Sequence, residues 1–359
     1  MYDPSKNQIG RKAPSIPRSL LKSRDDVQSI IRSAITPQQD YLKNSELNLM
    51  LRYHLGLVDE YDRPSNTFGG KAFRTGLCVL ACEAAGGKPA AANSAAAAIE
   101  LVHNFSLIHD DIQDQDEERR HRPTVWKIWG AAKAINAGNA LRMIADQELM
   151  KLTEKGFSKE ISLKASRLLA NRSLQMIQGQ YLDISFEERL NVSSREYKKM
   201  IAHKTGALIS CAMELGAITA SSKRNLSSLL GKVGWYFGYM FQLKDDVLGV
   251  WGDESITGKA QGSDIQRKKK TYPILYALRN APVKQKTTLH KIFRKQSLSD
   301  EDVSYTMCVL EDMKIREKTA ALVQEMSTEA MRLIAGAPIP PKTMNEFSDI
   351  VNYLLEREK

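Results

Sequence analysis

Hydrophobic residues recur with the three- to four-residue spacing of amphipathic helices along almost the whole chain, and strand-like alternation is nearly absent. No change in composition marks a boundary between domains, so the pattern predicts a single all-α domain. We expect residues 21–359 to form this domain and residues 1–20 to form a basic, loosely ordered tail. Helical segments are predicted over residues 37–56, 90–109, 131–153, 159–185, 195–220, 226–251, 270–280, 300–310, 315–335 and 343–358.

Charge and composition restrict the class of protein without naming it. The net charge of +10 favours anionic partners, and nucleic acid, acidic lipid and phosphate esters all remain open on this ground. No apolar run is long enough to predict a transmembrane helix, and the N-terminus lacks the apolar stretch of a signal peptide, which leaves a basic transit peptide open. Four cysteines lie in apolar helical patterns and are predicted to be buried thiols in a reducing, cytoplasmic setting: Cys78, Cys82, Cys211 and Cys308.

Two acidic clusters carry the chemistry, and each lies in a helical setting. His103, Asp110 and Asp114 share one helical stripe with Asp111 beside it, and Gln242, Asp245 and Asp246 share another. Crowded carboxylates repel one another unless a cation lies between them. Mg²⁺ suits this role, because it takes hard oxygen ligands and is usually held by one or two carboxylates together with substrate phosphates. Either cluster alone would be as easily explained by the solvated face of a surface helix.

Basic residues near the clusters shift the balance towards a phosphorylated substrate. Arg119 and Arg120 follow the first cluster, and Lys71 and Arg74 follow a glycine pair at a predicted helix start. Helix N-termini and fixed cations bind phosphate groups well. The long polar stretch 253–270 after the second cluster is expected to close a site, with a plain surface loop as the alternative.

The order of these motifs resembles that of the trans-isoprenyl diphosphate synthases, the polyprenyl synthetase family that includes farnesyl and geranylgeranyl diphosphate synthases. The resemblance covers roughly residues 40 to 357. It rests on Gly69–Arg74, Asp110–Pro123, Gln178–Asp183, Lys204–Thr205, Phe241–Asp246 and Thr257–Lys259, with Asp264, Lys269, Thr271 and Pro273 after them.

The resemblance implies an isoprenoid-synthase-type helical bundle around a deep central cavity. It implies condensation of isopentenyl diphosphate with an allylic diphosphate, three Mg²⁺ ions in each active site, a homodimer, and no role for nucleic acid. The implied metal ligands are Asp110, Asp111, Asp114, Asp245 and Asp246.

Roles for the other motif residues follow from the same resemblance. Arg119, Lys204, Lys259 and Lys269 would contact substrate, the first three at the allylic diphosphate. Thr205 and Gln242 would turn oxygens towards the allylic cation. The isopentenyl diphosphate would be held by Lys71, Arg74, His103 and Arg120.

Two positions depart from the family pattern. Ala72 stands where the family usually has arginine, and Gly249 stands where it usually has the third aspartate of the second motif. Asp253, one turn beyond Gly249, is a candidate to compensate through water. A class I terpene cyclase and a non-catalytic subunit of a heteromeric synthase are the alternatives. The second motif and the basic residues of an isopentenyl site argue against the cyclase, and the intact first motif argues against the subunit.

Product length is predicted from the residues before the first cluster. Phe105 lies five residues before Asp110, about 7.5 Å along the helix axis, and the small Ser106 lies four before it. In the family this combination resembles C20-forming enzymes, so geranylgeranyl diphosphate is the expected main product and farnesyl diphosphate the second choice. Ordinary core packing of Phe105 is the alternative.

Overall fold

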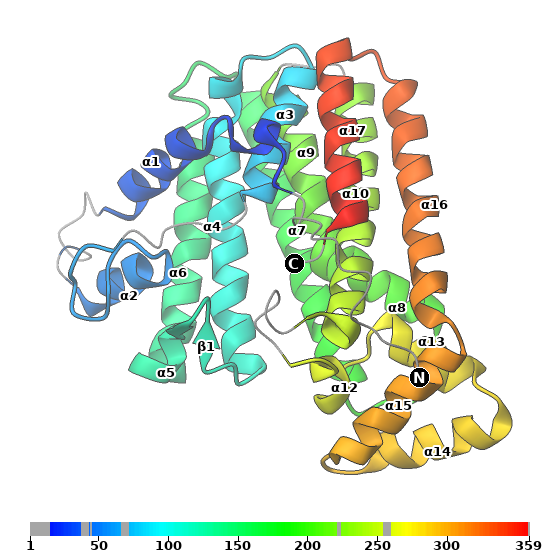
Figure 1. Cartoon of the computed structure of the whole chain (residues 1–359). Helices are drawn as coiled ribbons and strands as arrows, with labels where there is room; N and C mark the ends of the chain where they lie inside the picture. The colour runs from blue at the N-terminus through cyan, green and yellow to red at the C-terminus, as the bar shows by residue number, and fades with distance from the viewer. Residues whose placement is uncertain are drawn as a thin grey trace.

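The computed structural model describes residues 15–36, 43, 45–65, 72–220, 224–253 and 260–357, and almost all regular structure within them is helical (Figure 1). This confirms the predicted all-α class. In the described parts of the chain, the sheet is one antiparallel pair, β1 (Glu118–Arg119) and β2 (Arg122–Pro123). The helices are η2 (Arg18–Leu21), α1 (Arg24–Ile35), α2 (Glu46–His54), α3 (Phe73–Ala84), α4 (Pro89–Gln113), α5 (Val125–Trp129), α6 (Ala131–Met150), α7 (Lys159–Phe186), α8 (Ser194–Ile201), η3 (Ala202–Gly206), α9 (Ala207–Thr219), α10 (Arg224–Trp251), α12 (Ser263–Gln266), α13 (Tyr272–Asn280), α14 (Val283–Arg294), α15 (Asp300–Asp312), α16 (Ile315–Ala335) and α17 (Pro341–Glu356).

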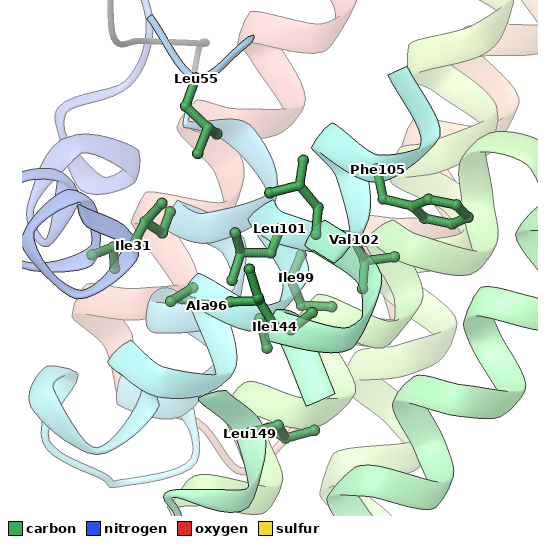
Figure 2. Packing of buried hydrophobic residues seen from close by; sticks show 14 of the residues in the cluster. Ile31, Leu55, Ala96, Ile99, Leu101, Val102, Phe105, Ile144 and Leu149 are labelled. Atoms are coloured by element: carbon green, nitrogen blue, oxygen red, sulfur yellow. The ribbon is translucent and has the colours of Figure 1, made fainter. Parts of the chain in front are cut away.

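Long helices stand side by side (Figure 1), and the two acidic clusters lie near the C-terminal ends of α4 and α10. Helix α4 packs on α6, α3 and α9, and α9 packs in turn on α10. Alanines 95–98 of α4 are fully buried, and their small side chains allow neighbouring helices to approach closely. Around them lies an apolar cluster that includes Ile99, Leu101 and Ile144 (Figure 2). The helix that carries the first cluster is thereby held rigidly.

A second apolar cluster fixes α10, which carries the second acidic cluster. Its fully buried side chains include Phe237 of α10 and Phe347 of α17, whose ring centroids are 6.4 Å apart. Burying a side chain of this size contributes about 1.5–3 kcal/mol relative to exposure. Helices α13, α14 and α15 form a lobe with a hydrophobic core of its own at one end of the bundle. Helix α12 lies at the same end (Figure 1).

The helix after α8 changes its winding where two predicted site residues lie. Ser193 caps α8 in a reciprocal pair with Glu196, and residues 202–206 then form a π-helix before α9 begins. Such π turns are rare and are found frequently at functional sites. A Cβ atom at Gly179 of α7 would lie 2.0 Å from the backbone nitrogen of Lys204, so α7 packs closely against this turn because residue 179 is glycine.

The packed part of the chain begins before residue 21, because η2 buries Leu20 against α3. This observation corrects the predicted boundary of the tail. Residues 1–14 lie outside the described residues. Three of the cysteines are buried as predicted, but Cys308 is exposed, because its position in α15 faces away from the core. No helix in the described ranges has both the length and the apolarity to cross a membrane.

Candidate active site

The first acidic cluster lies at the C-terminal end of α4, where the helix dipole already disfavours negative charge. Burial raises the pKa of Asp110 to about 6, and the carboxylates of Asp114 and Asp183 act in the same direction. Asp111 is buried, and the Nε atom of Arg119 donates to its Oδ1 at 2.7 Å. The cluster therefore contains Asp111, which has a fixed partner, and Asp110, which is buried near Asp114 and Asp183 with the charges of Lys204 and Arg119 acting against them.

A strained hairpin holds the two arginines that follow the first cluster. Arg119 ends β1, and the turn between the strands is formed by Arg120 and His121 with φ angles of 54° and 60°. Two-residue turns of this kind usually carry asparagine and glycine, because other residues tolerate positive φ poorly. Each such residue costs on the order of 1 kcal/mol. Strain of this kind concentrates at functional sites. Here the strained turn holds the cations of Arg119 and Arg120 next to each other after the first cluster.

A basic pocket is formed by residues of α3, α4 and the hairpin. Nη1 of Arg74 lies 3.3 Å from Nε2 of His103, and a buried Nε atom of Arg74 has no hydrogen-bond partner. Burial lowers the pKa of His103 well below its usual value, and the positive charges of Arg74, Arg120 and Arg119 lower it further. Convergent cations with an unused donor favour an anionic ligand.

The π turn presents two polar side chains to the space between the clusters. Nζ of Lys204 lies 2.5 Å from Oδ2 of Asp183 on α7. Burial alone would lower the pKa of Lys204, but the charges of Asp183 and Asp110 outweigh it and raise this pKa. The Thr205 hydroxyl donates to Oε1 of Gln242 at 2.6 Å. Lys204 is thus placed near Asp183 and the first acidic cluster, while Gln242 is held in one orientation.

The two aspartates of the second cluster have different surroundings. Asp245 is partly exposed and forms an ion pair at 2.6 Å with Arg357, whose guanidinium carbon lies 3.9 Å from the ring centroid of Phe241. Asp246 is buried and accepts hydrogen bonds at both oxygens, from the Gln242 amide, the Tyr197 hydroxyl and the Tyr272 backbone; their lengths are 3.0, 2.5 and 2.8 Å. Burial raises the pKa of Asp246 to about 7.

A cavity of about 480 Å³ opens beside the second acidic cluster, and Asp110, Asp111 and Asp114 of the first cluster are not among the residues that line it. Residues that line it include Asp183, Lys204, Gln242, Asp245, Asp264 and Lys269. Both acidic and basic side chains therefore line a space large enough for a diphosphate and part of a hydrocarbon chain.

Some predicted residues lie elsewhere or fall outside the described ranges. Lys71 and Lys259 belong to residues that the structure does not describe. Phe105 is buried on α4 with its ring centroid 4.8 Å from that of His109, and the Ser106 hydroxyl donates to the His103 carbonyl at 2.8 Å. Neither lines the 480 Å³ cavity. Figure 2 shows the Phe105 ring pointing away from the Ile99 and Ile144 side chains towards neighbouring helices.

The oxygen ligands of this site suit a Mg²⁺ ion whose coordination is completed by the substrate. Among the residues described, no three His, Cys, Asp or Glu side chains are close enough to hold a metal by themselves. Carboxylates from α7, α10 and α12 instead line the cavity, and Asp183 and Asp245 are each paired with a basic side chain. Mg²⁺ is commonly bound by one or two carboxylates together with substrate phosphates, so the residues present suit a metal that arrives with a diphosphate.

Sequence reasoning did not identify two residues of the site. Arg357 lies 112 positions after Asp245 and belongs to no motif that marks it, and Tyr197 belongs to an ordinary amphipathic pattern. Asp264 was quoted only as part of a trailing segment. The sequence signal for these side chains was weak. Arg357 is a basic residue at the end of the last helix, and Asp264 is a carboxylate shortly after a glycine.

Comparisons with known proteins agree with this geometry. Residues 62–310 match the sequence profile of the polyprenyl synthetases, which is well over half of the chain. The chain belongs to the polyprenyl synthetase family. It is 36% identical over 312 residues to the (2E,6E)-farnesyl diphosphate synthase of Mycobacterium tuberculosis, covering 86% of each chain. It is 33% identical over 294 residues to the geranylgeranyl diphosphate synthase of Saccharolobus solfataricus, covering 82% of this chain and 88% of the relative.

The family assignment extends to the solved structures. The crystal structure of a polyprenyl synthetase from Streptomyces coelicolor superposes with a TM-score of 0.85 at 34% identity, and the match covers 94% of this chain and 98% of that one. The predictions of a polyprenyl synthetase, a prenyltransferase and an isoprenoid-synthase-type helical fold are confirmed. Relatives named for different product lengths match similarly well, so the family alone leaves the product open.

Proposed function

We propose that this polyprenyl synthetase condenses isopentenyl diphosphate with an allylic diphosphate and forms geranylgeranyl diphosphate as its main product. The observation that carries the proposal is the separation of two anion-binding regions. One is the cavity lined by Asp183, Lys204 and Asp245. The other is the pocket around Arg74, His103 and Arg120, where basic side chains predominate and the charges of Glu100 and Asp245 act on Arg74. One diphosphate must leave with metal help and the other must stay, which suits this division.

Each group has a role that follows from its surroundings. Mg²⁺, three ions in our proposal, would neutralise the departing diphosphate when bound. Asp110, Asp114 and Asp245 would hold the Mg²⁺ ions. The allylic diphosphate would be contacted by Arg119, Lys204, Lys259 and Lys269. The allylic C–O bond breaks, the isopentenyl double bond attacks the allylic carbon, and a proton is lost from the new chain to the released diphosphate.

Two assignments from the sequence change in this proposal. Both Asp246 oxygens already accept hydrogen bonds, so we assign Asp246 to orienting Gln242 and not to holding metal. Arg119 engages Oδ1 of Asp111 through both Nε and Nη2, and we assign Asp111 to positioning that arginine. The Thr205 to Gln242 hydrogen bond leaves these two side chains suited to turn an oxygen towards the allylic cation.

The direct test is incubation with isopentenyl diphosphate, Mg²⁺ and each allylic primer in turn, followed by chromatography of the dephosphorylated products. C20 alcohol as the main product supports the proposal. C15 alcohol alone would contradict the length, and cyclic hydrocarbon or no product would contradict the reaction.

Product length is expected to respond to the two residues before the first cluster. Phe105→Ala should lengthen the product, because in our proposal it removes the ring at which the path for the growing chain ends, and Ser106→Phe should shorten it. Phe105→Leu provides a milder variant, since a buried Phe→Ala change costs about 3–5 kcal/mol. Leu107→Ala, two residues on and on the opposite face of α4, is the control. Unchanged length in both Phe105 and Ser106 variants would show that the path ends elsewhere.

We propose that a second copy of the chain covers an exposed apolar stripe on α6 and α7. The stripe comprises Ile135, Met143 and Met150 on α6 and Leu163, Leu174, Ile177, Tyr181 and Ile184 on α7. Leu174 and Tyr181 are 67% and 69% exposed and lie seven residues apart, on one face of the helix. Large apolar patches of this kind usually mark an interface.

Light scattering coupled to size exclusion tests the dimer. Wild type should have twice the mass of the chain, and Leu174→Arg with Tyr181→Arg should shift it to the monomer. Val283→Arg, at an exposed apolar residue of α14, is the control and should stay dimeric. A wild-type monomer, or a dimeric double variant, would contradict the interface.

A further inference from the structure

The family usually has a third aspartate at the position of Gly249. In this chain, the space that a side chain at residue 249 would take is occupied by a carboxylate from another part of the chain. A Cβ atom built on Gly249 would lie 1.9 Å from Oδ2 and 2.4 Å from Cγ of Asp264. Atoms cannot approach this closely, so any larger residue at 249 would displace the Asp264 side chain. Asp264 can therefore take this position only because residue 249 is glycine.

The segment that carries Asp264 is fixed to the end of α10. The backbone nitrogen of Gly262 donates to the Val250 carbonyl at 3.0 Å, and the Ser263 hydroxyl lies 3.4 Å from the Gly249 carbonyl. Ile265, the next residue after Asp264, is fully buried in the same apolar cluster as Val250. These contacts on both sides of Asp264 hold its carboxylate over Gly249.

Asp264 shares the active-site cavity with the second acidic cluster. It lines the same 480 Å³ space as Asp245, Lys204 and Lys269, and its negative charge contributes to the raised pKa of Asp246, after the larger effect of burial. Asp253, which the sequence suggested as the compensating residue, is exposed and does not line this cavity. The position of the missing third aspartate is thus supplied by Asp264 and not by Asp253.

We propose that Asp264 replaces the third aspartate of the second motif and holds, through bound water, the divalent cation that Asp245 binds. The pair Gly249 and Asp264 would then be a working substitute for the missing residue. This inference rests on the proposed function, because it assumes a metal bound together with a diphosphate. Residues that orient a metal's ligands or waters typically change its affinity about ten- to a hundredfold when they are mutated.

Binding of Mn²⁺ in the presence of inorganic diphosphate tests the role without relying on turnover. Free Mn²⁺ is measured by electron paramagnetic resonance during titration of the purified full chain. Asp264→Asn keeps the shape and removes the charge, and it should weaken the binding of one class of Mn²⁺ about ten- to a hundredfold. Gly249→Ala should weaken the same class, because the added methyl group displaces Asp264.

A transplanted carboxylate distinguishes a metal role from a structural one. The double variant Gly249→Asp with Asp264→Ala restores a carboxylate in the same space, and it should recover a substantial part of the lost Mn²⁺ affinity. Asp253→Asn is the control for loss of a nearby charge. Gly336→Ala is the control for the glycine change, because a Cβ atom there meets no atom closer than 3.6 Å. Both controls should bind Mn²⁺ as wild type does.

The outcomes separate this inference from the proposed function. Wild-type Mn²⁺ affinity in Asp264→Asn, with weakened binding in Asp245→Asn, would overturn the role of Asp264 and leave the proposed function intact. Weakened binding in Asp253→Asn alone would return the role to Asp253. If wild type binds no Mn²⁺ with diphosphate, the metal-dependent function fails, and the role of Asp264 fails with it. Melting curves identify variants that lose affinity only because they unfold.

Discussion

Replacing Asp245 with asparagine is expected to lower turnover by at least about a hundredfold, the scale on which enzymes lose a key electrostatic contact. Asp245 is the one aspartate of its pair that is partly exposed to the cavity, and its present partner is Arg357 at 2.6 Å. The amide keeps the shape but no longer attracts a metal. The measurement is the rate at saturating substrates as a function of Mg²⁺ concentration, together with the melting temperature.

Asp111→Asn should reduce turnover on a similar scale by a different route. Asp111 is buried and holds Arg119, so its loss leaves a cation poorly paired. We therefore expect Asp111→Asn to lose stability as well, by about 1–3 kcal/mol, whereas Asp245→Asn should melt close to wild type. Asp312→Asn, at an exposed aspartate in α15, is the control for both. Near-normal turnover in a chelator, or in both variants, would contradict a metal held between two acidic faces.

The fold was predictable from the sequence wherever helices are long and amphipathic. The ranges 131–153, 159–185 and 315–335 agree closely with α6, α7 and α16. The helices α1 and α14 were missed, and α3 was predicted only through its start after the glycine pair and the helical pattern around Cys78 and Cys82, without a range. Helix α3 is almost entirely buried, so its apolar residues leave no amphipathic stripe to detect. The two acidic clusters were found because each is local, with its carboxylates within one or two turns of a single helix.

The parts that sequence reasoning missed depend on contacts between distant segments. The pairing of Asp245 with Arg357 and the seating of Asp264 on Gly249 arise only after α10, α12 and α17 have packed together. The left-handed turn at Arg120 and His121 is also hidden, because neither residue type predicts positive φ. Ala72 is similar: the sequence marks it as a departure from the family, and the structure adds a φ of 49°.

The π turn adds a further feature that periodicity does not reveal. It changes the helical spacing over five residues and so alters which side chains face the cavity. The sequence identified Lys204 and Thr205 through their resemblance to a family motif, whereas a regular helix would give no reason for choosing them. Family motifs and periodicity thus contributed different information, and only the motifs led to the residues at this turn.

The two substrates should respond to different basic residues. Arg74→Ala and His103→Ala are expected to raise the apparent KM for isopentenyl diphosphate about ten- to a hundredfold, because a charge-assisted hydrogen bond contributes about 1.5–3 kcal/mol. The KM for the allylic primer should change little in both. Arg119→Ala should do the reverse, since Arg119 is held by Asp111 beside the first acidic cluster. Initial rates with each substrate varied in turn give both constants.

The basic pocket also makes a finer test of geometry possible. Arg74→Lys keeps the charge but removes the planar, five-donor guanidinium, so it should recover only part of the affinity lost in Arg74→Ala. Arg63→Ala removes a cation that is paired with Asp59 at an exposed position, and it is the control for a change in net charge. If the Arg74, His103 and Arg119 variants all affected the two substrates equally, the division into an isopentenyl site and an allylic site would be wrong. A single shared anion site would then have to bind both diphosphates, although Arg74 and His103 do not line the cavity that contains Asp245 and Lys204.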